Sequence, residues 1–140
     1  MLLTNGEIFQ GAQALAKLSA MEFPVKTSYG ILRVMRQIKD QADVINETRD
    51  GLIKRYDTPK DGGQTGIQPG DDNWESFVSE FNTLMNFEVD LDVYPIVLTE
   101  DGFGEDAKID AATLASLERF LTDKPYDPNE KKEETTDVQP

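Results

Sequence analysis

The amino-acid sequence predicts a single α+β domain organised around one long amphipathic helix. Apolar residues recur at helical spacing over about 29 residues in the first half of the chain. A shorter helical pattern precedes this stretch, and a third follows a segment rich in glycine and proline. Near residue 90 the apolar period changes to strict alternation, which is typical of a strand with one buried face.

The first predicted helix runs from about Asn5 to Met21. Thr4 and Glu7 have the spacing of a capping box, in which each side chain bonds the backbone N–H of the other residue. Phe23 precedes Pro24, and a residue before proline is pushed out of the helical region. We therefore expect a short helix that turns back into the next one.

The second predicted helix follows Thr27 and Ser28, which we expect to cap it. At 1.5 Å per residue it is about 43 Å long, against roughly 25 Å for the first helix. A hairpin partner of that length covers little more than half of the apolar seam, so a later element or a second subunit must cover the rest. The seam consists of Ile31, Met35, Ile38, Ala42, Ile45, Arg49, Leu52 and Tyr56.

Residues 57–72 contain almost nothing to bury and are predicted to form a mobile loop. A third helix is predicted to follow, with Asp72 as its cap. Its apolar face makes it the best candidate to cover the far end of the long helix. That face consists of Trp74, Phe77, Val78, Phe81, Leu84 and Met85.

Residues 87–93 alternate apolar and acidic side chains and are predicted to form a strand. A single strand cannot satisfy its own backbone groups. We expect its partner in residues 96–98, in the 57–72 loop or in another chain, and the last option favours an oligomer. A short helix capped by Asp110 completes the predicted domain at residues 1–121, and residues 122–140 are predicted to be a disordered acidic tail.

The net charge of −13 is unevenly placed. Residues 1–60 hold nine Lys or Arg and seven Asp or Glu, whereas residues 61–140 hold five and twenty. An acidic surface repels phosphate backbones, so we expect no direct binding of nucleic acid. The charge pattern is compatible with a basic protein partner or head-to-tail self-association, and it is also compatible with acidity that only maintains solubility.

The composition argues against an enzyme, a cofactor site and a metal site. Histidine and cysteine are both absent, which excludes the commonest general base and the Ser-His-Asp and Cys-His arrangements. The carboxylate row of residues 88, 90 and 92 does not match a calcium-binding loop, because Val93 and Thr99 occupy the positions that require glycine and glutamate. We therefore expect no catalytic, cofactor-binding or metal-binding residues.

One basic cluster lies on the first half of the long helix, and two interpretations of it remain open. It is a solvated face with helical ion pairs such as Arg36 with Asp40, or it is a docking surface for the acidic end of a neighbouring molecule. The cluster consists of Lys26, Arg33, Arg36 and Lys39. Together with the far end of the seam, the candidate interaction residues are Ile45, Leu52, Tyr56, Arg33 and Arg36.

The segment Phe23-Pro-Val-Lys-Thr-Ser-Tyr29, leading into a helix that ends Leu52-Ile-Lys-Arg-Tyr56, resembles a widespread family of small tailed-phage proteins of unknown function. The resemblance extends over about residues 1–121. It implies a phage-encoded protein that acts in an infected bacterium, and it carries no catalytic residues. It also implies that Val25 and Tyr29 pack the hairpin corner and that Thr27 or Ser28 caps the second helix.

These observations together predict a non-enzymatic phage protein with a virion-associated or assembly role, acting through helical packing and self-association. The alternative is an accessory inhibitor of a host protein, with an acidic surface that mimics a nucleic acid. The start of the sequence has no signal-peptide pattern, and no apolar stretch has the length of a membrane span. We expect the protein in the host cytoplasm or the virion, not secreted and not in a membrane.

Overall fold

The computed structural model describes residues 1–57, 66–98, 103–104 and 107–124. These residues form helices with a few short strands, as an α+β chain should. In chain order the elements are β1 (Leu2–Thr4), α1 (Asn5–Ser19), α2 (Val25–Arg55), α3 (Trp74–Asn86), β2 (Glu88–Asp90), β3 (Ile96–Val97), α4 (Ala111–Ser116), a 3-10 turn (Glu118–Phe120) and β4 (Leu121–Thr122).

Helix α1 begins with the predicted capping box. The N–H of Glu7 donates to Oγ1 of Thr4 at 3.0 Å, and the N–H of Thr4 donates to Oε1 of Glu7 at 2.9 Å. The helix ends at Ser19, two residues before the predicted end. The local signal thus fixed where the helix starts more accurately than where it ends.

Helix α2 is one unbroken helix of 31 residues, but it begins earlier than predicted. Pro24 is its N-cap residue, and Thr27 and Ser28 lie inside the helix, so the prediction that they cap it is wrong. The N–H of Ser28 already donates to the carbonyl oxygen of Pro24 at 3.0 Å. Pro24 has φ −52° and ψ 152°, which is outside the helical region, so Val25 is the first helical residue.

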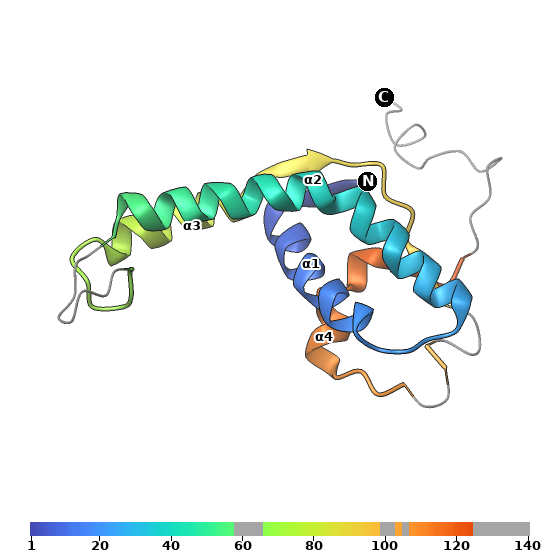
Figure 1. Ribbon diagram of the computed structural model, residues 1–140. Helices are drawn as coiled ribbons and strands as arrows, with labels where there is room; N and C mark the ends of the chain where they lie inside the picture. Colours follow the sequence, from blue (N-terminus) through green and yellow to red (C-terminus); the bar gives the residue numbers. More distant parts are fainter. Residues whose placement is uncertain (58–65, 99–102, 105–106, 125–140) are drawn as a thin grey trace, which may run out of the picture.

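Two helices share the length of α2, as Figure 1 shows: α1 packs against its first half and α3 lies along its second half. Ile45 and Leu52, in the second half, are buried together with Leu84 of α3. This confirms the prediction that the third helix covers the far end of the long one. We call the second half of α2 (residues 40–55) together with α3 the two-helix arm.

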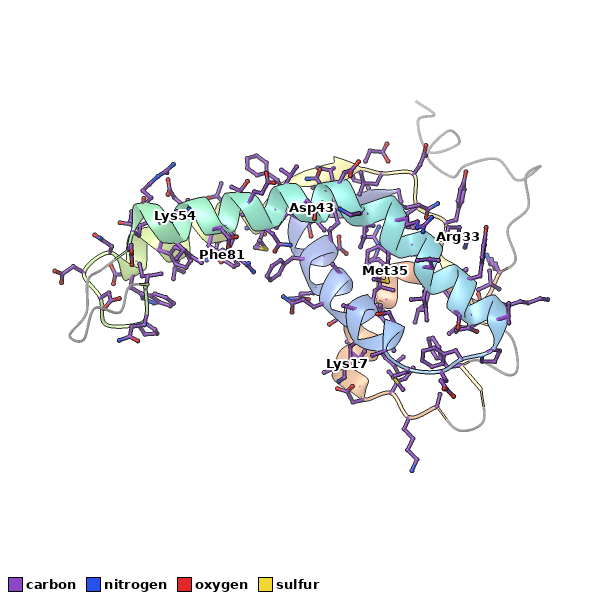
Figure 2. All side chains as sticks on the ribbon, in the orientation of Figure 1. Lys17, Arg33, Met35, Asp43, Lys54 and Phe81 are labelled. Carbon is purple, nitrogen blue, oxygen red and sulfur yellow. The ribbon has the colours of Figure 1, made fainter. Side chains whose placement is uncertain are left out.

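The two-helix arm is linked to the body of the molecule by aromatic rings. Phe81 of α3 meets Phe9 of α1 edge to face at 6.3 Å and stacks on Phe77 at 5.8 Å. Figure 2 shows Phe81 beneath α2, on the side from which α1 descends. Such aromatic pairs add stabilisation beyond the area they bury, so they help to fix the arm to α1.

Strand β2 pairs antiparallel with β1, the first strand of the chain. The register places Leu3 opposite Val89, and the N–H of Asn5 extends the pairing by donating to the carbonyl oxygen of Phe87 at 2.8 Å. The three partners proposed for this strand from the sequence are therefore wrong. Because β1 pairs with the backbone groups of β2 within the chain, β2 is no longer a reason to expect an oligomer.

The C-terminal part of the described chain closes the core beneath α1. Strand β4 runs parallel to β3 and pairs Thr122 with Val97, so regular structure extends past residue 121; residues 125–140 lie outside the described part. The ring of Phe120 is fully buried where Gly11 of α1 leaves room for it.

The predicted mobile loop lies partly outside the described part of the chain, because residues 58–65 are not described. Residues 66–72 include a turn in which the N–H of Asp71 donates to the carbonyl oxygen of Gln68 at 3.1 Å.

Candidate protein-interaction surface

Three of the five candidate interaction residues lie in contacts within the chain. Ile45 is fully buried and Leu52 nearly so. Tyr56 is half-buried, and its hydroxyl donates to Oε2 of Glu80 in α3 at 2.8 Å. These residues hold α3 against α2, and Ile45 and Leu52 offer no external surface.

The exposed apolar residues of α2 lie near its beginning. Val25 is 84 % exposed, Tyr29 65 % and Leu32 48 %. The expectation that Val25 and Tyr29 pack the hairpin corner is therefore wrong. Phe23 fills that corner instead, in contact with the ring of Phe103 at 5.3 Å.

These exposed residues occupy one stripe of the helix. Val25, Tyr29, Leu32 and Arg36 are separated by four, three and four residues, which places them one above the other on the same side. All four are exposed, whereas the buried residues of the same turns are Thr27, Gly30, Ile31 and Val34. We call Val25, Tyr29, Leu32 and Arg36 the α2 outer face.

Positive charge surrounds the α2 outer face. The first fifteen residues of α2, 25–39, contain four Lys or Arg and no acidic residue. A helical ion pair joins Lys39 to Asp43 at 2.7 Å, and this bond raises the pKa of Lys39 above its usual value. Arg36 forms no ion pair with Asp40 or with any other residue in the described ranges.

Arg33 borders the α2 outer face and connects it to the chain segment before β3. Its Nη2 atom donates to the carbonyl oxygens of Tyr94 at 3.1 Å and Pro95 at 3.2 Å. The guanidinium also lies 5.9 Å from the centre of the Tyr94 ring, within the range of a cation–π contact. Figure 2 shows Arg33 directed away from α1, on the side of this segment. Its Nε atom is buried and has no acceptor among the described residues.

A shallow open groove runs between the apolar and basic residues of this surface. Its volume is about 270 Å³, and it is lined by Tyr29, Leu32, Arg33, Arg36 and Gln37. The Gln37 side chain is held in place, because its Oε1 accepts a hydrogen bond from the N–H of Tyr94 at 3.0 Å. The groove therefore combines the apolar side chains of Tyr29 and Leu32, the Arg36 cation, which is unpaired within the described part of the chain, and the fixed amide of Gln37.

The described residues contain no group of three or more Asp or Glu side chains placed to hold a metal ion. None of the helices in this part of the chain is long and apolar enough to cross a membrane. What the α2 outer face offers chemically is apolar contact and the recognition of carboxylates, since an arginine guanidinium donates paired hydrogen bonds to them.

The sequence pointed to Arg33 and Arg36 and missed their apolar neighbours. The signal was present: Val25, Tyr29 and Leu32 lie opposite the seam of α2, at positions where a solvated helix has polar residues. Comparison with known proteins adds no further guide, because no family model, no curated protein and no solved structure matches this chain.

Proposed function

We propose that this chain is a non-enzymatic phage protein that acts by binding other proteins, in the virion or during its assembly. The observation that carries the proposal is the α2 outer face, where three large apolar side chains are exposed beside Arg36, which forms no ion pair with another described residue. Contiguous apolar residues with a polar rim are a common feature of protein-interaction sites. Tyrosine and arginine are also enriched where protein interfaces have their strongest contacts.

The composition supports binding in preference to catalysis. A chain without histidine or cysteine lacks the side chains on which most acid–base and nucleophilic catalysis depends. The resemblance of the Phe23–Tyr29 segment to small tailed-phage proteins supplies the biological setting. Two earlier reasons for self-association no longer apply, because α3 covers the seam and β1 pairs with β2; the uneven charge and the α2 outer face remain.

The alternative, an inhibitor that mimics a nucleic acid, requires a continuous row of unpaired carboxylates. The outer side of α2 continues from Arg36 into Asp43, Glu47 and Asp50, all of them exposed. Two of these carboxylates, however, are paired with cations: Asp43 with Lys39 and Asp50 with Arg49. This row on α2 is therefore a poor nucleic-acid mimic, and the alternative depends instead on the twenty acidic residues of the C-terminal part, residues 61–140, projecting from one face.

A complementation experiment tests the proposed function. A phage that encodes this chain is deleted for it and supplied in trans with wild-type protein, with Tyr29→Ser/Leu32→Ser or with Leu114→Ser. Plaque number and the protein content of gradient-purified particles are measured. We expect the double variant to lose particle yield or particle association, although it folds normally by circular dichroism. Leu114→Ser is the matched control, because Leu114 is an exposed apolar residue on α4.

Two results would contradict the proposal. One is a deletion phage that assembles normal particles while wild-type protein is absent from purified particles. The other is a double variant that behaves like wild type in both measurements.

A further inference from the structure

The spacing of the α2 outer face is the pattern of a helix that packs against another helix. Positions alternating by four and three residues form the seam by which two helices contact each other. Helix α2 already has one such seam, centred on Ile31, Ile38 and Ile45, and it is buried inside this chain. Val25, Tyr29, Leu32 and Arg36 form a second seam on the opposite side, and no described element covers it.

We propose that this second seam binds an acidic amphipathic helix of a different protein, and that this helix covers only the first half of α2. The inference rests on the proposed function and names the chemistry of the partner. Apolar side chains of the partner pack on Tyr29 and Leu32, and its carboxylates pair with Arg36 and Lys26.

The charge of this half of α2 selects an acidic partner. The chain has 27 acidic residues, yet it places none between residues 25 and 39 and none in the first turn of α2. The N-terminal end of a helix carries a partial positive charge, which an acidic side chain there stabilises and a cation destabilises. Lys26 is thus unfavourable for the isolated helix, and a carboxylate supplied by a partner relieves this unfavourable arrangement.

The same helix also limits how far the partner extends. Beyond Lys39 the outer side carries Asp43, Glu47 and Asp50, which repel an acidic helix. The usable stretch from Val25 to Lys39 is about 20 Å long, which corresponds to a partner helix of about 13 residues. A partner of this length fits a docking segment better than a long coiled coil.

The binding surface is held in position before the partner arrives. Arg33 is fixed by the carbonyl oxygens of Tyr94 and Pro95, and Gln37 by the N–H of Tyr94. The groove between Tyr29 and Leu32 on one side and these polar residues on the other can accept one apolar side chain of the partner. Because these groups are already ordered, less conformational entropy is lost on binding.

A second copy of this chain fits the surface less well. The acidic half of α2 in another copy offers carboxylates at residues 43, 47 and 50, but none of these three positions is apolar. The carboxylates of this second copy could pair with Arg36, but Val25, Tyr29 and Leu32 would then face charged side chains. Exposed ion pairs alone contribute about 0–1 kcal/mol each, too little to offset the cost of association.

An unbiased peptide selection tests the proposal. Random 16-residue peptides are displayed and selected on the wild-type full chain, and the selected peptides are measured against Leu32→Ser, Arg36→Glu and the control Leu114→Ser. We expect enriched peptides to be acidic, with apolar residues at helical spacing. We expect their affinity to fall about tenfold or more on Leu32→Ser and on Arg36→Glu, to fall in high salt, and to be unchanged on Leu114→Ser.

Several outcomes overturn the inference. These are no enrichment, enrichment of basic or uncharged peptides, and peptides that bind Arg36→Glu or Leu32→Ser as well as wild type. Sedimentation of the wild-type chain tests whether a second copy covers the α2 outer face. A dimer that dissociates on Arg36→Glu or on Asp43→Arg, and that forms again when both substitutions are combined, would show that it does.

The selection and the complementation experiment fail independently. If no acidic peptide is selected but Tyr29→Ser/Leu32→Ser still loses particle association, the chemistry assigned to the partner is wrong and the proposed function stands. If acidic peptides bind as expected but the variant supports normal particles, the surface binds a helix outside the proposed phage role. Arg36 and Leu32 are exposed, so their variants are expected to keep the wild-type melting temperature.

Discussion

The side-chain amide of Gln41 donates a hydrogen bond to Oδ1 of Asn5 at 3.0 Å, at the point where three helices meet. Asn5 is nearly fully buried, and its Nδ2 donates in turn to the carbonyl oxygen of Leu84 at 3.0 Å. Asn5 begins α1, Gln41 lies in the middle of α2 and Leu84 is near the end of α3. One buried amide thus connects the body of the molecule to the two-helix arm.

Asn5→Ala is expected to lower the free energy of unfolding by about 1–3 kcal/mol. It leaves the carbonyl oxygen of Leu84 with only the long hydrogen bond from the N–H of Phe87, at 3.4 Å, and it removes the acceptor of the Gln41 amide. Urea denaturation followed by circular dichroism measures the change. Asn82→Ala is the control, because Asn82 is an exposed asparagine on α3 and alanine favours the helix. Equal stability of the two variants would show that the amide contributes nothing to the junction.

Substitutions at the neighbouring residues Val44 and Ile45 test whether the seam in the second half of α2 belongs to the protein core or to an external surface. Ile45 is fully buried, while Val44 beside it is 52 % exposed. Ile45→Asp is expected to unfold the domain, since it buries an unpaired charge, and Ile45→Val to cost about 0.5–1.5 kcal/mol. Val44→Asp is expected to remain folded. A folded Ile45→Asp variant that only changed its oligomeric state would contradict the intrachain role of the seam.

The helices could be predicted from the sequence because their signals are local. The seam that contains Ile45 repeats apolar residues in consecutive helical turns, and the capping box at Thr4 and Glu7 spans four residues. The partner of β2 could not be predicted, since its register is set by a fold that brings Leu3 and Val89 together from 86 positions apart, and no local pattern records it.

The α2 outer face was missed for a different physical reason. Arg33 and Arg36 were recognised by their charge, but Tyr29 was assigned to a packed corner on the family resemblance. Whether such a residue is covered depends on which other elements reach it. Phe103 reaches Phe23 and completes the corner without Tyr29.

Two glycines in helices predict opposite effects of the same substitution. A Cβ on Gly11 of α1 would lie 2.3 Å from Cε2 of the buried Phe120 ring, whereas a Cβ on Gly51 of α2 meets nothing within 4 Å. Gly11→Ala is expected to destabilise the domain by about 1–3 kcal/mol, because the added methyl group forces the fully buried ring to shift. Gly51→Ala is expected to stabilise it by about 0.5–1 kcal/mol through helix propensity.

Thermal denaturation of the two alanine variants beside wild type provides the measurement. A Gly11→Ala variant as stable as Gly51→Ala would mean that α1 and the Phe120 ring are not in close contact. Gly11→Ala combined with Phe120→Leu is a useful further variant, since a smaller side chain at residue 120 should recover part of the loss caused by the added methyl group.

The phenol of Tyr56 is expected to titrate above its ordinary range. Its hydroxyl donates to the carboxylate of Glu80, and this hydrogen bond raises the pKa of Tyr56. Loss of the proton breaks the bond and places two negative charges side by side. Because the pKa is raised in the folded state, the stabilisation is fully present below the unfolded pKa of about 10 and is lost as the pH rises through the folded value.

Difference titration of the phenolate absorbance between wild type and Tyr56→Phe isolates this group from the other tyrosines. Glu80→Gln should lower the pKa of Tyr56 toward its ordinary value, since the amide carries no charge. Arg55→Ala should raise it further, because the Arg55 guanidinium lies 3.3 Å from the same Glu80 oxygen and its charge lowers the pKa of the phenol. Opposite shifts in the two variants are the signature of a charge effect at the end of the two-helix arm. If neither variant moves the titration, the contact between Tyr56 and Glu80 is absent in solution.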